Sequence, residues 1–223
     1  MAINLQKGQT INLRKSDHGD ELYDLSSVTI GLGWDVKKCG GFFSRLLGIN
    51  SGPEYDLDAI AFLLDHNGKV ANMGKTCPAG NGKEIVLYKG DVIYFNSMRH
   101  PGGKIWLTGD NRTGAGDGDD EQIIVQLDEL DERYQKILFV VSIYQGLTHR
   151  QHFGMIENAF IRAVDAKGKE ITKFSLSGDD SMNGMCSMVF AEAYRHDGDW
   201  KFRAIGEPHR TDNFIDILVP YTY

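Results

Sequence analysis

The residues with the most distinctive chemistry lie in one short run, GDNRTGAGDGDDE, at positions 109–121. The run combines five carboxylates and one asparagine amide with four glycines. Carboxylates at close range repel one another and raise each other's pKa. Such a run is therefore either a solvated loop or a binding site for a positive ion, and Arg112 is its only basic residue. A hard divalent cation would balance the charge, because calcium binds about six to eight oxygens of carboxylates, carbonyls and amides.

Other metals, and a helix-flanked calcium loop, fit the run less well. Histidine and cysteine are absent from it, which disfavours zinc, and magnesium prefers fewer protein ligands. An EF-hand loop needs Asp at its first position and Glu at its twelfth, as at Asp110 and Glu121. Its third, fifth and sixth positions would be Arg112, Gly114 and Ala115, and strands are expected on both sides, so we reject the EF-hand.

The elements that position the run are expected to be strands. Apolar residues alternate with Thr and Gly in SSVTIGLGWD (26–35), whereas DLDAIAFLLD (56–65) is apolar on both faces and precedes an Asn-Gly turn. A strand is also expected at 136–145, and hairpins are expected within 159–176 and 188–207. These signals predict an all-β fold, a two-sheet β-sandwich with short helical elements in its connections. The helical candidates are 41–49 and 127–136.

The direction of the side chains decides whether the carboxylates meet. If the chain is extended after Gly116, Asp117, Asp119 and Glu121 point to one face, in line with the apolar residues at 123, 125 and 127. The carboxylates then continue the core-facing row beyond its apolar end.

Two further strands carry carboxylates at their ends. Asp56 and Asp58 open one strand in line with the apolar residues at 60, 62 and 64, and Asp35 closes another. Carboxylates from three strands are thus expected to converge at one rim of the sandwich. Because a buried carboxylate without a partner is costly, this convergence predicts a calcium site at that rim.

Composition limits the remaining possibilities. The chain has 223 residues with 31 acidic and 24 basic side chains, and its net charge of −7 argues against a general nucleic-acid binder. No apolar stretch is long enough to cross a bilayer, and the N-terminus lacks the apolar core of a signal peptide. The three cysteines show no CxxC spacing, which indicates neither a zinc site nor a disulfide framework. These features predict a cytoplasmic protein.

Five blocks form an ordered set along the chain: GLGWD at 31–35, DLDA at 56–59, the acidic run at 109–121, ENAFIR at 157–162 and LSGD at 176–179. Together they resemble the signature blocks of the TerD family, the bacterial tellurium-resistance and general-stress proteins. The resemblance covers most of the chain in order. It departs from the family in two extended connections, near 37–53 and 73–88, and in a C-terminus that lacks a glycine-rich amphipathic ending.

The resemblance implies a single β-sandwich domain over 1–223 that binds one or two calcium ions and has no catalytic activity. It further implies a cytoplasmic role in resistance to tellurite and other stresses, together with other Ter-type proteins that include a membrane-bound one. Nucleic acid is not an expected partner, and the oligomeric state stays open. The metal ligands implied by matching motif positions are Asp35, Asp56, Asp58, Asp110, Asn111, Asp117, Asp119, Asp120, Glu121, Glu157 and Asn158.

Two alternatives to this function remain open at the level of sequence. Clustered carboxylates would also suit a metal-dependent phosphoesterase, in which paired divalent ions activate water, although no general base is evident. A purely structural calcium site in a scaffold protein is the other alternative.

The remaining predictions concern single segments and residues. The apolar segment 42–47 is either packed on the sandwich or a contact surface for a partner. Trp106 and Trp200 are predicted to be core residues, and His149 and His152 to lie in a surface loop.

Overall fold

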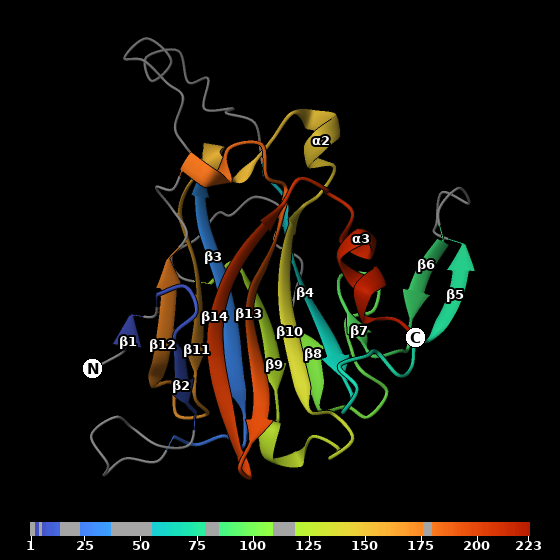
Figure 1. Ribbon diagram of the computed structural model, residues 1–223, viewed down its shortest axis with the longest axis vertical. Helices are drawn as coiled ribbons and strands as arrows, with labels where there is room; N and C mark the ends of the chain where they lie inside the picture. The colour runs from blue at the N-terminus through green and yellow to red at the C-terminus, as the bar shows by residue number, and fades with distance from the viewer. Residues whose placement is uncertain are drawn as a thin grey trace.

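The computed structural model describes residues 3–4, 6–13, 23–36, 55–78, 85–108, 119–175 and 180–223. Two six-stranded sheets lie face to face as a β-sandwich (Figure 1), which confirms the predicted fold. The first sheet consists, in spatial order, of β1 (Ile3–Asn4), β12 (Glu170–Ser175), β11 (Ile156–Val164), β3 (Val28–Val36), β9 (Glu121–Val125) and β8 (Ile105–Leu107).

The second sheet and the smaller elements complete the described chain. The sheet consists of β2 (Thr10–Asn12), β14 (Asp199–His209), β13 (Ser187–His196), β10 (Lys136–Ile143), β4 (Leu57–Leu64) and β7 (Val92–Ile93). A separate two-stranded ribbon is formed by β5 (Lys75–Pro78) and β6 (Ile85–Tyr88). The helical elements are α2 (Gly146–His149), α3 (Phe214–Leu218) and four 3-10 turns, η1 (Leu127–Glu129), η2 (Phe153–Met155), η3 (Asp180–Met182) and η4 (Val219–Tyr221). Within the ranges described, no helix is long and apolar enough to cross a membrane.

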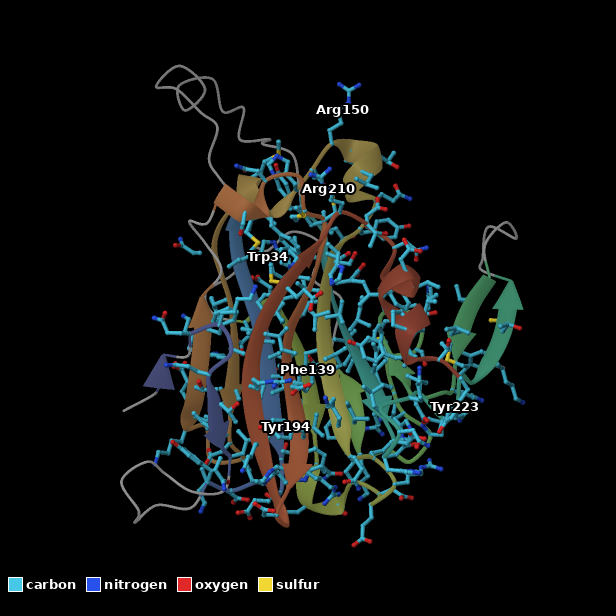
Figure 2. All side chains as sticks on the ribbon, in the orientation of Figure 1. Trp34, Phe139, Arg150, Tyr194, Arg210 and Tyr223 are labelled. Atoms are coloured by element: carbon cyan, nitrogen blue, oxygen red, sulfur yellow. The ribbon has the colours of Figure 1, made fainter. Side chains whose placement is uncertain are left out.

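The main core lies between the sheets and follows the period-two pattern. In β3 the residues Val28, Ile30, Leu32 and Trp34 are all buried in it, and in β9 the pattern of buried residues alternates from Glu121 to Val125. Phe139 lies in the middle of the sandwich (Figure 2). Each large side chain buried in this way contributes about 1.5–3 kcal/mol.

The tryptophan and hairpin predictions are largely confirmed. Trp200 is 2 % exposed, and its Nε1 donates a hydrogen bond to the carbonyl oxygen of Leu127. Strands β11 and β12, and strands β13 and β14, form the two predicted hairpins. Trp106 differs from its prediction, because it is only half-buried and the Arg99 guanidinium lies over its ring at 5.1 Å.

A second apolar cluster explains why β4 is hydrophobic on both faces. Ala61 and Leu63 belong to the main core, whereas Phe62 faces the opposite side of the sheet. There the C-terminal segment covers it, since the rings of Phe214 and Tyr221 each lie 6.3 Å from the Phe62 ring. The C-terminal segment therefore adds a partial third layer over β4 (Figure 1).

Several local predictions are wrong or lie outside the described chain. Only one 3-10 turn, η1, forms within 127–136, where a helix was predicted. The connection near 73–88 contains the two paired strands β5 and β6. The helical candidate at 41–49 and the apolar segment 42–47 fall outside the described residues. His149 ends the one-turn helix α2 and is exposed, while His152 is half-buried beside η2.

Candidate metal site

The ends of four strands meet at one rim of the sandwich. Strand β3 ends there, and β4, β9 and β11 begin there (Figure 1). In the strand register, Asp35 is paired with Glu157 and Leu32 with Glu121. The predicted convergence of the acidic strand ends is therefore confirmed for the backbone. Trp34 lies in the same half of the view as the exposed Arg150 and Arg210 (Figure 2).

Glu121 links the two sheets at this rim. It is the first residue of β9 and only 2 % exposed, in the core-facing row that the sequence predicts. Its Oε2 accepts a hydrogen bond of 2.6 Å from the backbone N–H of Ala59 in β4. Burying a carboxylate costs free energy unless donors compensate for the lost water, and Ala59 supplies one such donor.

Asp58 lies on a different side of the second sheet from Glu121. It occupies the row of Ile60 and Phe62, which faces the cluster under the C-terminal segment. It is 6 % exposed and opposite Ser142 in β10, whose hydroxyl donates to the carbonyl oxygen of Asp212. Asp56 is half-buried immediately before β4. The period-two pattern holds here, but it directs Asp58 away from the space between the sheets.

Asp119 also departs from the predicted direction. Its Oδ1 accepts a 2.7 Å hydrogen bond from Arg162 Nε, and its Oδ2 accepts one of 3.2 Å from Gln122 Nε2. A Cβ atom at Gly31 would lie 2.2 Å from the Asp119 carboxylate. Gly31 and Arg162 are register partners in β3 and β11, at positions that point away from the main core. The prediction that Asp119 and Glu121 face the same way is wrong, because the regular strand begins only at Glu121.

Asp120 completes a set of three consecutive carboxylates, each of which accepts a hydrogen bond from a different strand. Its Oδ2 accepts a hydrogen bond of 3.0 Å from the backbone N–H of Trp34 in β3. That N–H lies beyond the last register pair of β3 and β9, so the side chain extends the ladder by one bond. We call Asp119, Asp120 and Glu121 the acidic anchor.

The remaining predicted ligands divide into two groups. Asp35 and Glu157 are paired in the strand register, and the structure describes only their backbones. Asn158 has a φ of 53° and lies where the pairing of β11 with β3 is irregular. Asp110, Asn111 and Asp117 lie outside the described residues. In the described part of the chain, no three His, Cys, Asp or Glu side chains are grouped closely enough to hold a metal ion. Ligation by the eleven predicted residues stays a prediction.

The phosphoesterase alternative gains no support from this arrangement. A paired-metal centre needs several carboxylates around one space. Among the described residues, Asp58, Asp119 and Glu121 point to three different places.

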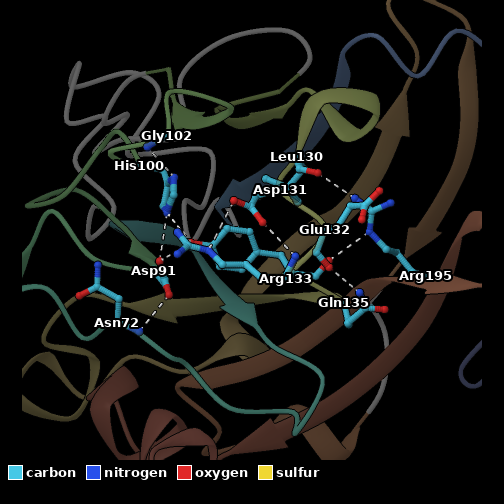
Figure 3. A network of polar contacts seen from close by, with 11 residues as sticks. Asn72, Asp91, His100, Gly102, Leu130, Asp131, Glu132, Arg133, Gln135 and Arg195 are labelled. Atoms are coloured by element: carbon cyan, nitrogen blue, oxygen red, sulfur yellow. Dashed lines mark hydrogen bonds and ion pairs between the residues drawn. The ribbon is translucent and has the colours of Figure 1, made fainter.

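A buried polar network that the sequence does not reveal lies away from the rim (Figure 3). Asp91 is fully buried, and its Oδ1 accepts hydrogen bonds from Tyr134 Oη at 2.7 Å and His100 Nε2 at 3.0 Å. His100 Nδ1 accepts from Gly102 N, which assigns the ring proton to Nε2. Burial raises the pKa of Tyr134 well above its usual value, and its hydrogen bond to Asp91 acts in the same direction. The network joins three segments of the chain, and its members are buried and bonded to one another, which indicates a structural role.

Some of the anchor's partners carried a signal in the sequence. A glycine inside a strand often marks a close approach of another group, and Gly31 does so for Asp119. Arg162 had no such signal, because an outward-facing arginine in a strand is ordinarily solvated. The backbone donors Trp34 N and Ala59 N cannot be read from residue type at all.

Comparison with known proteins agrees with this fold. The sequence matches the TerD domain family over residues 1–219. It is 53 % identical to the tellurium resistance protein TerX of Serratia marcescens over 99 % of this chain and 100 % of that protein. It is 42 % identical to the stress response protein SCP2 of Bacillus subtilis (strain 168), again over 99 % of this chain and 100 % of that protein.

Solved structures also match. The protein of unknown function SAV2460 matches with a TM-score of 0.58 and 25 % identity, over 89 % of this chain and 98 % of that one. A TerD homologue from Streptomyces coelicolor A3(2), SCO6318, matches with a TM-score of 0.57 and 21 % identity, over 85 % of this chain and 94 % of that one, which supports the fold. On these grounds, the chain belongs to the TerD domain family.

Proposed function

We propose that the protein is a non-catalytic, calcium-binding stress-response protein that contributes to resistance to tellurite and other stresses. Its relatives named for tellurium resistance and stress response support this role. The observation that carries the metal proposal is the meeting of acidic strand ends at one rim, with Asp35 opposite Glu157.

The proposed ion is held at the rim by oxygen ligands. Asp35 and Glu157 enter the set as register partners, and Asp110, Asn111 and Asp117 enter it as members of the acidic run. This donor chemistry fits calcium, which prefers carboxylate, amide and carbonyl oxygens. Asp119, Asp120 and Glu121 already accept hydrogen bonds from the protein, and we propose the five residues just named as the principal ligands. One or two ions are compatible with this donor set.

Calcium binding would act by neutralising and stiffening the rim. A stiff rim could then present a constant surface to a partner, and other Ter-type proteins are the partners we propose. No catalytic step is needed for this role. The proposed place of action is the cytoplasm.

The first test is the thermal midpoint of unfolding in chelator and in excess calcium. A ligand that binds only the folded state at about 100 times its Kd adds about 2.7 kcal/mol. For a chain of this size the midpoint should then rise by about 5–10 °C. The variant Asp117→Ala should lose most of that rise while keeping the midpoint measured in chelator.

Two controls make this test specific. Asp128→Ala alters an acidic residue of η1, beyond the acidic run, and should keep the calcium-dependent rise. Magnesium at the same concentration should give a smaller rise than calcium. An unchanged midpoint of the wild-type protein in calcium would contradict the proposed function.

A further inference from the structure

The C-terminal end of the acidic run is attached to the sandwich by three consecutive side chains. Asp119 reaches β11 through Arg162, Asp120 reaches β3 through Trp34 N, and Glu121 reaches β4 through Ala59 N. These contacts involve strands of both sheets. We propose that the acidic anchor is a metal-independent fastening of the acidic run, in which Arg162 supplies the positive charge that a metal ion would otherwise have to supply.

The burial of Asp119 supports this assignment. Its side chain is 2 % exposed, and the side chain of Arg162 is 31 % exposed. Removing one partner of such a buried pair leaves an uncompensated charge, which is costly. Asp119 therefore depends on Arg162 more than an exposed carboxylate would.

The contacts around the Asp119 carboxylate depend on the particular residues that surround it. Arg162 also pairs through Nη1 with Glu170 Oε2 at 3.2 Å, so Asp119 and Glu170 share one guanidinium. Gly31 leaves the space that the Asp119 carboxylate occupies. The two backbone N–H groups and the planar guanidinium are donors with fixed directions, so each binds a carboxylate in a defined orientation.

If the acidic anchor holds the run in place, fewer residues of the run are available as calcium ligands. Asp119, Asp120 and Glu121 act as positioning residues, and the residues before them are left to meet the ion. This inference rests on the proposed function only for what it says about calcium, because the anchor itself needs no metal.

The decisive measurement is the thermal midpoint of each variant, once in chelator and once in excess calcium. Arg162→Gln should lower the midpoint by roughly 5–10 °C in both solutions, because it leaves Asp119 buried without its cation. Arg162→Lys should restore part of the loss, because it keeps the charge without the two-pronged geometry. Glu170→Gln is the matched control on the same arginine and should lower the midpoint by about 2 °C or less, because the Glu170 side chain is 28 % exposed.

The calcium affinity of the same variants separates the anchor from a ligand. Asp119→Asn should lower the midpoint in chelator and keep the calcium-dependent rise, with a calcium Kd by isothermal titration within about threefold of wild type. A normal midpoint in chelator combined with loss of calcium binding would make Asp119 a ligand and overturn the inference. Tighter calcium binding by Arg162→Gln would also overturn it, because Arg162 would then compete with the ion.

Failure of the anchor is distinguishable from failure of the proposed function. If the wild-type protein bound no calcium, the losses in chelator would still test the anchor. Amide hydrogen exchange in chelator gives an independent reading, since Trp34 N–H and Ala59 N–H should be protected in wild type. That protection should fall at least tenfold at Trp34 in Asp120→Ala and at Ala59 in Glu121→Ala. Fast exchange of both amides in the metal-free wild type would overturn the inference.

Discussion

At the scale of single residues, Asp91, His100 and Tyr134 form a buried hydrogen-bonded group. Tyr134 and His100 both donate to Asp91 Oδ1, and the backbone N–H of Asn72 donates to Asp91 Oδ2 at 3.0 Å. His100 and Tyr134 are nine and 43 residues from Asp91 in the chain. None of them belongs to a recognisable motif. Such a network is invisible in one sequence because its partners are brought together only by the completed fold.

The network leads to a prediction about alkaline pH. Because the pKa of Tyr134 is raised in the folded protein, its contribution to stability is complete below the unfolded value of about 10. That contribution is lost as the pH rises through the folded pKa. Tyr134→Phe should lower the free energy of unfolding at pH 8 by about 1–3 kcal/mol, since Asp91 loses a donor. It should also flatten the loss of stability above pH 10, measured by urea unfolding at several pH values.

The matched control for this prediction is an exposed tyrosine. Tyr144→Phe changes a side chain that is 40 % exposed and should leave both the stability at pH 8 and its alkaline slope nearly unchanged. A Tyr134→Phe variant with the wild-type slope above pH 10 would show that Tyr134 does not carry the alkaline sensitivity.

At the scale of elements, the regular strands and hairpins could be predicted because each pattern is local. Alternation identified β3 and β9, and turn residues identified the hairpin of β13 and β14 around Asp197 and Gly198. Asp65 and Asp165 accept hydrogen bonds from the backbone N–H groups two and four residues later, so two turns of the form DxxGK close in the same way. The Asn-Gly signal at 67–68 predicted the first of these turns, and the glycine within the expected hairpin at 159–176 predicted the second.

The segment 127–136 could not be predicted in this way. Its apolar residues Leu127, Leu130 and Tyr134 have a helix-like spacing, yet all three are buried as a cap at one end of the core. The carbonyl oxygens that a helix would have bonded are taken by Arg195, which donates to Leu130 O at 2.8 Å and to Tyr134 O at 3.1 Å. A tertiary partner 60 or more residues away therefore replaces the helix.

Arg195 is accordingly expected to hold this segment in place. Arg195→Gln removes two hydrogen bonds from a charged donor and the contact of the guanidinium with the Trp200 ring, whose centroid lies 4.6 Å from Cζ. The free energy of unfolding should fall by about 2–4 kcal/mol. The exposed Arg210 gives the control, because Arg210→Gln should change it by less than about 0.5 kcal/mol. Equal effects of the two substitutions in urea unfolding would count against a role for Arg195.

At the scale of the whole molecule, the sequence predicted where the strand ends of the candidate site meet but not where all of their side chains point. The convergence of the strand ends follows from the antiparallel arrangement, in which alternate ends share one rim. The side-chain directions did not follow, because Asp119 precedes β9 and Asp58 belongs to the face beneath the C-terminal segment. Period-two reasoning holds within a strand and fails outside it, as at Asp119, which lies two residues before β9 begins.

The C-terminal segment makes the second sheet part of a three-layer arrangement. Leu218 is 1 % exposed in the cluster that contains Phe62, whereas its neighbour Val219 is 60 % exposed. Backbone and side-chain bonds fasten the end of the chain, since Val70 N donates to Tyr221 O at 2.7 Å and Lys69 Nζ to Pro220 O at 2.8 Å. The layer is thus a stable cover for β4 and its neighbours.

This arrangement predicts a large difference between two adjacent positions. Leu218→Ala should lower the free energy of unfolding by about 2–5 kcal/mol, because it leaves a cavity over β4. Val219→Ala should change it by less than about 0.5 kcal/mol. Thermal unfolding in chelator should show the same loss for Leu218→Ala, because the packing of Leu218 on this cluster involves no metal ion. If both alanine variants unfolded like wild type, the C-terminal segment would not be a structural layer, and the two-faced burial of β4 would need another explanation.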